Sequence, residues 1–103
     1  MKIEEVFARR RFIMLDGAMG TQLQLPGLTP EQKPELAAFI MPDVLTAVHR
    51  DYARAGADIL LANTFGANPR KLKGTGYTVQ QVIEASIACA RTAAQETGAL
   101  VAL

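Results

Sequence analysis

Two apolar runs in this sequence each end in a short polar segment, and this repeated arrangement limits the folds open to the chain. Residues 12–15 (FIML) run into residues 16–21 (DGAMGT), and residues 59–62 (ILLA) run into residues 63–68 (NTFGAN). Unbroken apolar runs are typical of parallel strands that are buried on both faces. Ligands of such sheets bind beyond the carboxyl ends of the strands, so both polar segments are expected at one functional edge.

Three strands are predicted, over residues 11–15, 58–64 and 99–103. Helical segments separate them, and an alternation of apolar strands with helices indicates an α/β fold with a parallel sheet. A closed (β/α)8 TIM barrel takes ~250 residues. Residues 1–103 are therefore predicted to be a partial barrel domain, about two β/α units and a third strand from its N-terminal part. We expect the remaining barrel strands, or a second copy, to cover the open sheet edge.

Two main helices are predicted from their end signals. Pro42 suits the first turn of a helix, where its missing N–H is not needed, and Gly56 suits the helix terminus. Thr78 and Gln81 have the spacing of a capping box, and Gly98 ends the helix that follows. Each of these helices leads directly into the next predicted strand.

Other segments are expected to be short or irregular. A lead-in helix is predicted over residues 3–10 from its apolar spacing, and a one-turn helix is predicted after Asn68. Residues 22–41 are predicted to be a long irregular loop, because Pro26 and Pro34 interrupt any periodic element. A loop of this length in a compact domain is usually functional.

Composition excludes several classes of protein. The 11 basic and 10 acidic residues give a net charge of +1, which provides no electrostatic footprint for nucleic acid. The single cysteine, Cys89, allows neither an internal disulfide nor a zinc cluster, so the chain is expected to be cytoplasmic and reduced. No apolar stretch approaches the ~20 residues that span a bilayer, and the N-terminus lacks the apolar core of a signal peptide.

Asp16 and Gly17 are the first candidates for a binding site. A carboxylate that leaves a buried strand is costly unless a cation or hydrogen-bond donor meets it. Gly17 and Gly20 allow a close backbone approach and can direct N–H groups at an anion. This combination suits a zwitterionic amino acid, whose ammonium group would face Asp16. The alternative is that Asp16 caps a turn and Gly17 only permits that turn.

Asn63, Thr64 and Phe65 are expected to share the same rim, at the end of the second strand. The amide and hydroxyl groups can orient a substrate without adding charge, and Phe65 could form a pocket wall. The alternative is a turn-forming asparagine and a core phenylalanine. His49 is interpreted as a structural or partly exposed histidine, and Cys89 as a small buried thiol.

The segments 16–23 (DGAMGTQL), 42–58 and 63–68 with the following Lys71-Leu72 form a joint pattern. The pattern resembles the opening of the homocysteine S-methyltransferase domain, particularly that of cobalamin-dependent methionine synthases. The resemblance implies methyl transfer to homocysteine to give methionine. It also implies substrate binding by Asp16 and Gly17, with Asn63 and Thr64 lining the same pocket.

The resemblance further implies a zinc ion, held by cysteine thiolates late in the barrel, that binds the homocysteine sulfur. Those cysteines are absent from this chain, so no metal ligand and no catalytic residue is assigned here, and the chain alone is expected to be inactive. The implied donor is methylcobalamin, although betaine and S-methylmethionine serve related enzymes. The alternatives are a non-catalytic barrel fragment and a small-molecule-binding module that assembles with another chain.

Overall fold

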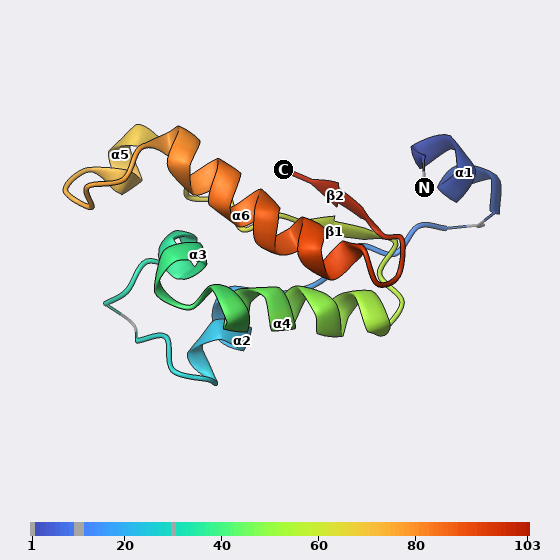
Figure 1. Ribbon diagram of the computed structural model, residues 1–103, viewed down its shortest axis with the longest axis horizontal. Coiled ribbons are helices and arrows are strands. Elements are labelled where there is room, and N and C mark those ends of the chain that lie inside the picture. Colours follow the sequence, from blue (N-terminus) through green and yellow to red (C-terminus); the bar gives the residue numbers. More distant parts are fainter. Residues whose placement is uncertain (1, 10–11, 30) are drawn as a thin grey trace.

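A small parallel sheet lies at the centre of the structure, where β1 (Ile59–Leu61) pairs with β2 (Leu100–Ala102). In their register Ile59 lies opposite Leu100. On the other side of β1, Leu15 forms a parallel bridge with Ile59. The three predicted strand regions are therefore neighbours that run in one direction, as their alternation with helices predicted (Figure 1).

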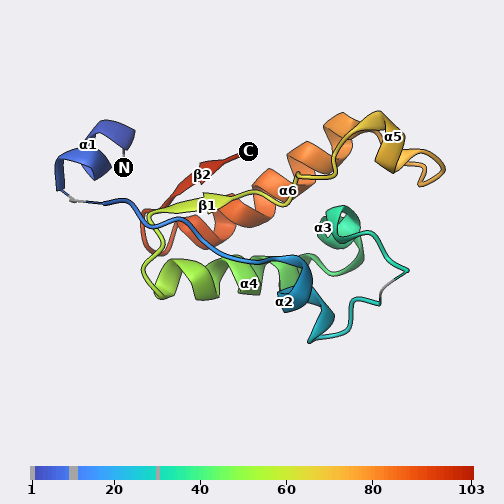
Figure 2. The same ribbon diagram turned by 180° about the vertical axis from the view of Figure 1, so that it is seen from behind.

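Helices make up most of the remaining structure. The computed structural model describes residues 2–9, 12–29 and 31–103. In chain order its helices are α1 (Ile3–Arg9), α2 (Gly20–Gln24), the 3-10 helix η1 (Pro34–Leu36), α3 (Ala37–Ile40), α4 (Pro42–Arg54), α5 (Pro69–Leu72) and α6 (Val79–Ala94). Figures 1 and 2 show α4 and α6 side by side on one face of the strands, whereas α1 stands at the end opposite α5. None of the described helices is long and apolar enough to cross a membrane.

The two main helices end as their sequence signals predicted. Pro42 occupies the first turn of α4, and Gly56 follows that helix with a φ of 112°. Both halves of the capping box are present at α6. The Thr78 side chain accepts a hydrogen bond from the N–H of Gln81, and the Gln81 side chain accepts one from the N–H of Thr78. After α6, Gly98 takes a φ of 78° and donates its N–H to the carbonyl of Ala94 at 2.8 Å.

The predicted strand over residues 11–15 is wrong in extent. Only Leu15 pairs as a strand residue, and Arg11 lies outside the described residues. Two side chains take the place of ladder acceptors: Asp58 accepts from the N–H of Met14 at 2.9 Å, and Asp16 accepts from the N–H of Leu61 at 3.1 Å. The segment lies along β1, but carboxylates replace part of its backbone ladder. The other two strands are also shorter than predicted.

The prediction that residues 22–41 are irregular is wrong in part, because this segment contains part of α2 and all of η1 and α3. The prolines exclude a long helix but not short helical turns. Pro34 starts η1, where its missing N–H costs nothing. Leu23 and Leu28 are buried, and the N–H of Leu28 donates to the carbonyl of Leu23 at 3.0 Å. Local hydrogen bonds and buried leucines therefore order the segment.

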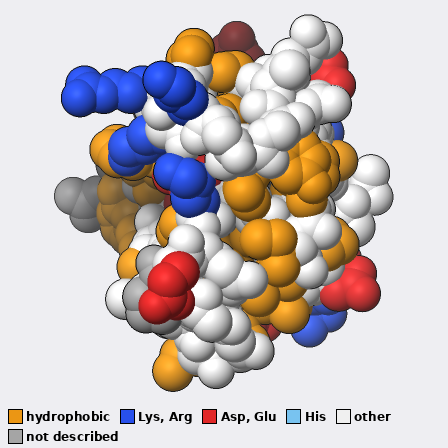
Figure 3. Space-filling view, turned by 90° about the vertical axis from the view of Figure 1, so that its left-hand side faces the viewer, with side chains coloured by type: hydrophobic (Ala, Val, Ile, Leu, Met, Phe, Trp, Pro, Cys, Tyr) orange, Lys and Arg blue, Asp and Glu red, His pale blue; other side chains and the backbone are white. Residues whose placement is uncertain are grey.

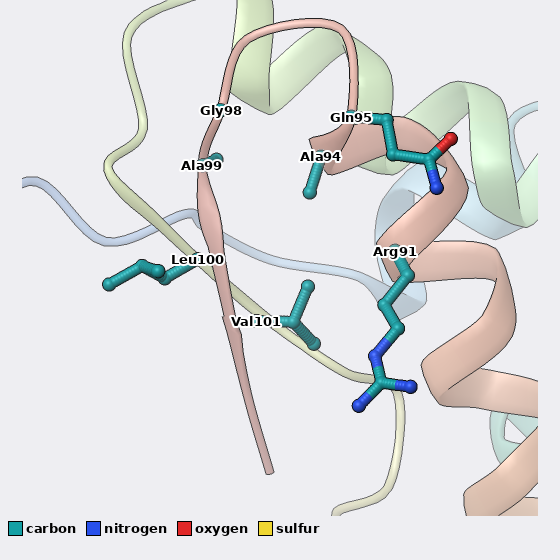
Figure 4. Close-up of a pocket in the computed structure, with 7 residues that line it drawn as sticks. All are labelled: Arg91, Ala94, Gln95, Gly98, Ala99, Leu100 and Val101. Carbon is teal, nitrogen blue, oxygen red and sulfur yellow. The ribbon is translucent and has the colours of Figure 1, made fainter. Parts of the chain in front are cut away.

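The helices cover one face of the sheet and leave the other open. Leu60 is fully buried with Ala53 of α4 and Ala93 of α6. Burial of such a leucine side chain is worth about 2 kcal/mol. Figure 4 shows Val101 directed toward α6 and Leu100 directed away from it, around a hollow of about 350 Å³. Because strand side chains alternate between faces, Leu61 belongs to the uncovered face, where it is 42% exposed.

The exposed edge at β2 predicts self-association of the 103-residue chain. Unpaired strand edges and apolar surface recruit partners, and Leu103, beside this edge, is 71% exposed. Leu103→Lys should shift the chain toward monomer in sedimentation velocity measurements, because a charge opposes edge pairing. Leu25→Lys is the matched control, since Leu25 is 82% exposed at the end of α2. Equal sedimentation of both variants and the original chain would contradict an edge contact.

Candidate functional site

The carboxyl ends of the strands face one end of the molecule, which Figure 3 shows directly. Hydrophobic side chains cross this end, and Lys and Arg side chains gather at one margin of it. Asp16 comes directly after the Leu15 bridge, and Asn63 follows β1 by two residues. The pairing of the strands therefore brings both polar segments to the same end, as expected.

Asp16 is a half-buried carboxylate with only part of its hydrogen-bonding capacity in use. Its Oδ2 accepts from the N–H of Leu61 at 3.1 Å, whereas the buried Oδ1 has no donor among the residues that the structure describes. Burial raises the pKa of the Asp16 carboxyl, and hydrogen bonds from the backbone N–H groups of Leu61 and of Asp16 itself partly oppose that shift. The side chain thus supports the local structure through one oxygen and leaves the other without a donor.

The backbone after Asp16 is held by Tyr52 of α4. The Tyr52 hydroxyl donates to the carbonyl of Ala18 at 2.6 Å. A Cβ at Gly17 would lie 3.0 Å from the Tyr52 hydroxyl oxygen and 3.1 Å from its Cε1. A side chain at this position would fit only if the tyrosine ring moved by a few tenths of an ångström, so glycine suits the close contact between loop and ring. Helical spacing places Tyr52 on the apolar face of α4, but it does not reveal the contact with this loop.

Asn63 and Thr64 make hydrogen bonds within the protein. The Asn63 amide donates to the carbonyl of Pro34 at 2.5 Å, and the Thr64 hydroxyl lies 3.5 Å from the carbonyl of Ala62. Asn63 therefore holds η1 over the end of β1. The side-chain oxygen of Asn63, Oδ1, accepts no hydrogen bond from the described residues and remains available as an acceptor.

Glu35 joins the same rim, and sequence reasoning did not identify it. Its half-buried side chain lies directly against the backbone of Gly66, in the space that a Cβ at that position would need. Two contacts, from Glu35 and from Asn63, thus join η1 to the loop after β1. A tertiary contact of this kind has no local signal, because 31 positions separate Glu35 from Gly66.

Phe65 does not form a pocket wall in this structure. Its side chain is 96% exposed, and the ammonium of Lys71 lies 5.3 Å from the centre of its ring. A cation–π contact at such an exposed site contributes about 0.5–1 kcal/mol. The sequence predicts a packed Phe65, either in a pocket wall or in the core, whereas the side chain is exposed in this structure.

The described residues do not offer a metal site. Among them, no three His, Cys, Asp or Glu side chains are close enough together to hold an ion. Cys89 is buried in α6, where its thiol lies 3.8 Å from the carbonyl of Pro42. The described residues therefore do not fit a zinc ion.

His49 is a buried structural residue, so the alternative of a partly exposed histidine is wrong. The residue is fully buried in α4, and neither ring nitrogen has a hydrogen-bond partner among the described residues. Burial lowers the pKa of the His49 imidazole to about 4, because the charged form loses its hydration. The neutral ring is therefore the form that the fold accommodates.

The sequence profile of the homocysteine S-methyltransferase family matches residues 13–103, which is most of the chain. The chain belongs to the homocysteine S-methyltransferase family. It is 38% identical over 97 residues to a methionine synthase of Mycobacterium tuberculosis. It is also 28% identical over 99 residues to the homocysteine S-methyltransferase YbgG of Bacillus subtilis. These matches cover 86% and 91% of this chain.

Solved structures support the same membership. The chain superposes on the metallated form of the homocysteine methyltransferase MmuM from Escherichia coli with a TM-score of 0.84 and 26% identity. The match covers 97% of this chain and 39% of the MmuM chain. The chain spans 8% of the methionine synthase and 31% of YbgG. This homocysteine S-methyltransferase sequence thus corresponds to a minor part of each relative.

Replacement of His49 tests its burial as a neutral ring. Between the unfolded pKa of 6.5 and the folded pKa of about 4, the unfolded chain binds a proton that the folded chain does not. The free energy of unfolding should therefore fall by about 1.4 kcal/mol per pH unit as the solution is acidified through this window. His49→Gln, which does not titrate, should lack this component in urea denaturation curves recorded from pH 8 to pH 4.

The difference between the original chain and His49→Gln removes the contribution of the carboxylates common to both. The contribution of one of these carboxylates, Asp16, to the free energy of unfolding has the opposite sign. Because the pKa of Asp16 is raised in the folded chain, its contribution stabilises the folded state as the pH falls toward the ordinary pKa of an aspartate. Superimposable pH profiles for the two proteins would show that His49 is charged or solvated in the folded chain.

The chain is expected to bind no zinc tightly by itself. A tetrahedral protein site needs three or four converging ligands, which the described residues do not supply. Metal analysis of the chelator-washed 103-residue chain, after zinc addition and gel filtration, should show far less than one equivalent. Stoichiometric zinc that survives Cys89→Ser would reveal a ligand set unrelated to the thiol.

Proposed function

We propose that this chain contributes the amino-acid-binding rim of a barrel that transfers a methyl group to homocysteine and produces methionine. The observation that carries the proposal is the half-buried carboxylate of Asp16 at the carboxyl end of the strands, whose Oδ1 has no hydrogen-bond partner among the described residues. An ammonium group that donates to this carboxylate would satisfy the acceptor and offset its cost of burial. Membership of the family supports homocysteine as the source of that ammonium.

The other end of the amino acid would meet backbone donors. Among the described residues, the N–H groups of Gly17, Ala18 and Met19 donate no hydrogen bond to the protein. Free N–H groups beside a carboxylate suit a zwitterion, whose carboxylate and ammonium groups need opposite partners. The free carbonyl oxygen of Asn63 and the Thr64 hydroxyl would line the same pocket. Phe65 would have to move from its exposed position to close it.

The role of the chain's own residues is to bind and orient the amino acid. The zinc expected for the complete domain would keep the homocysteine sulfur as a thiolate at neutral pH. Its ligands would come from residues outside this chain, because the described ones do not fit the metal. Methylcobalamin is the proposed donor, in line with the similarity to methionine synthases.

The remaining barrel strands, or a second copy of the chain, would cover the open edge at β2, and the chain alone would be inactive. A cytoplasmic location is part of the same proposal. A small-molecule-binding module without catalysis, which keeps the Asp16 carboxylate at the strand ends, is the second candidate. The two candidates differ in whether methionine is formed.

A chimera tests the proposed function. The matched segment, which is 86% of this chain, would replace the corresponding segment of the Mycobacterium tuberculosis methionine synthase, with which it shares 38% identity. We expect the chimera to bind homocysteine in calorimetric titrations and to form methionine in the presence of its methyl donor. Binding without turnover would favour the second candidate. A folded, zinc-loaded chimera that does not bind homocysteine would exclude both candidates.

Two substitutions at Asp16 separate binding from support of the fold. Asp16→Asn keeps an oxygen for the N–H of Leu61 but removes the charge, so homocysteine binding in the chimera should weaken by roughly 1.5–3 kcal/mol at unchanged melting temperature. Asp16→Ala also removes the acceptor, so it should lower the melting temperature as well. The turn-cap alternative predicts unchanged homocysteine affinity in Asp16→Asn.

Asn63→Ala is expected to act through a different route. Since the Asn63 amide holds the carbonyl of Pro34, its loss should free η1 and lower stability by about 0.5–1.5 kcal/mol, the value of a neutral hydrogen bond. The effect on homocysteine affinity should be smaller than that of Asp16→Asn. Thermal melts and titrations of the same samples measure both quantities, and a larger affinity loss at Asn63 would reverse the assigned roles.

A further inference from the structure

Tyr52 contacts the loop after Asp16 through both its ring and its hydroxyl. The ring lies against the Cα of Gly17, where an added Cβ would come within 3.0–3.3 Å of three tyrosine atoms. The hydroxyl donates to the carbonyl of Ala18 at 2.6 Å. Tyr52 belongs to α4, a helix of 13 residues that packs against α6 and β1. The loop is thus tied at two points to a rigid element of the fold.

The hydrogen bond to Ala18 also sets the direction of the next N–H group. The Ala18–Met19 peptide is trans, and in a trans peptide the C=O and N–H bonds point in opposite directions. Because the Ala18 carbonyl points at the Tyr52 hydroxyl, the N–H of Met19 points away from α4. That N–H makes no hydrogen bond with the described residues. The contact therefore presents a free donor on the side of the loop that α4 does not occupy.

We propose that Tyr52 is a positioning residue of the substrate rim. Its hydroxyl fixes the orientation of the Ala18–Met19 peptide, so that the N–H of Met19 receives the carboxylate of the amino-acid substrate. The choice of homocysteine as that substrate rests on the proposed function. The orientation of the peptide rests only on the contacts of this chain. Tyr52 itself touches no substrate, and its effect passes through the loop backbone.

The first experiment tests the orientation in the 103-residue chain itself. Tyr52→Phe keeps the ring and removes the hydrogen bond to Ala18. We expect the carbonyl carbon resonance of Ala18 to move, and the amide of Met19 to exchange its proton several-fold faster with solvent. Tyr77→Phe is the matched control, because Tyr77 is the other tyrosine of the chain and stacks on Phe39. Unchanged Ala18 and Met19 signals in Tyr52→Phe would overturn the proposal.

The second experiment separates the two ends of the ligand in the zinc-loaded chimera. The probes are homocysteine and 3-aminopropane-1-thiol, which keeps the thiol and the ammonium but lacks the carboxylate. Tyr52→Phe should raise the dissociation constant of homocysteine about 3- to 10-fold, as expected for the loss of one hydrogen bond, and leave that of the aminothiol unchanged. Asp16→Asn should weaken both ligands, because both carry the ammonium group, and Tyr77→Phe should weaken neither.

The outcomes separate failure of the role of Tyr52 from failure of the proposed function. An equal loss for both ligands in Tyr52→Phe would mean that the tyrosine supports the whole site and does not orient the carboxylate donor, which overturns the proposal. Homocysteine binding that Asp16→Asn weakens and Tyr52→Phe does not would also overturn it, while the proposed function would stand. If the chimera binds neither probe, the proposed function fails, and the Ala18 and Met19 signals still decide the role of Tyr52.

Discussion

The burial of Leu60 is the constraint on which the rest of the structure depends. This side chain lies among Ala53, Ala93 and Ala94, so it joins β1 to both main helices at once. Since strand side chains alternate, an inward Leu60 directs its two neighbours to the opposite face and sets the register with β2. The same register places the polar segments that follow Leu15 and β1 at one end of the molecule. A slip by one residue would expose Leu60 and separate the rim from its supports.

The helices could be predicted from sequence because their end signals are local. Thr78 with Gln81, and glycines after each main helix, act within a few residues, and the structure contains them as predicted. The extent of the strand over 11–15 could not be predicted correctly, because carboxylates replace part of its backbone ladder. Asp58, whose carboxylate accepts a hydrogen bond from the N–H of Met14, lies more than forty residues further along the sequence. The hydrophobic pattern of the sequence reveals the apolar run, but it does not reveal that a distant side chain replaces a backbone acceptor of the strand.

In the candidate site, too, local features could be predicted from sequence, whereas contacts between distant residues could not. Asp16 and Gly17 could be proposed from sequence because a carboxylate at the end of a buried strand is costly without a partner, and because a second polar segment follows the next strand. Their supports could not, since Tyr52 lies 34 positions from Ala18 and looks like an ordinary residue of an apolar helix face. The position of Phe65 after a strand end predicts a pocket wall or a core residue, although the loop leaves its side chain exposed. Residue chemistry thus predicts candidates, whereas their orientation depends on contacts between distant segments.

The contact between Glu35 and Gly66 has a consequence for how this rim can change during evolution. A Cβ at position 66 would overlap the carboxylate of Glu35, so a substitution there requires the Glu35 side chain to turn away. The overlapping atoms are the far end of a flexible side chain, so this movement is cheap and η1 can keep its place. A shorter residue at position 35 removes the need for the movement and opens space beside the strand end. Both loops therefore shape this rim, and libraries that diversify the two together would sample it more widely than libraries of either loop alone.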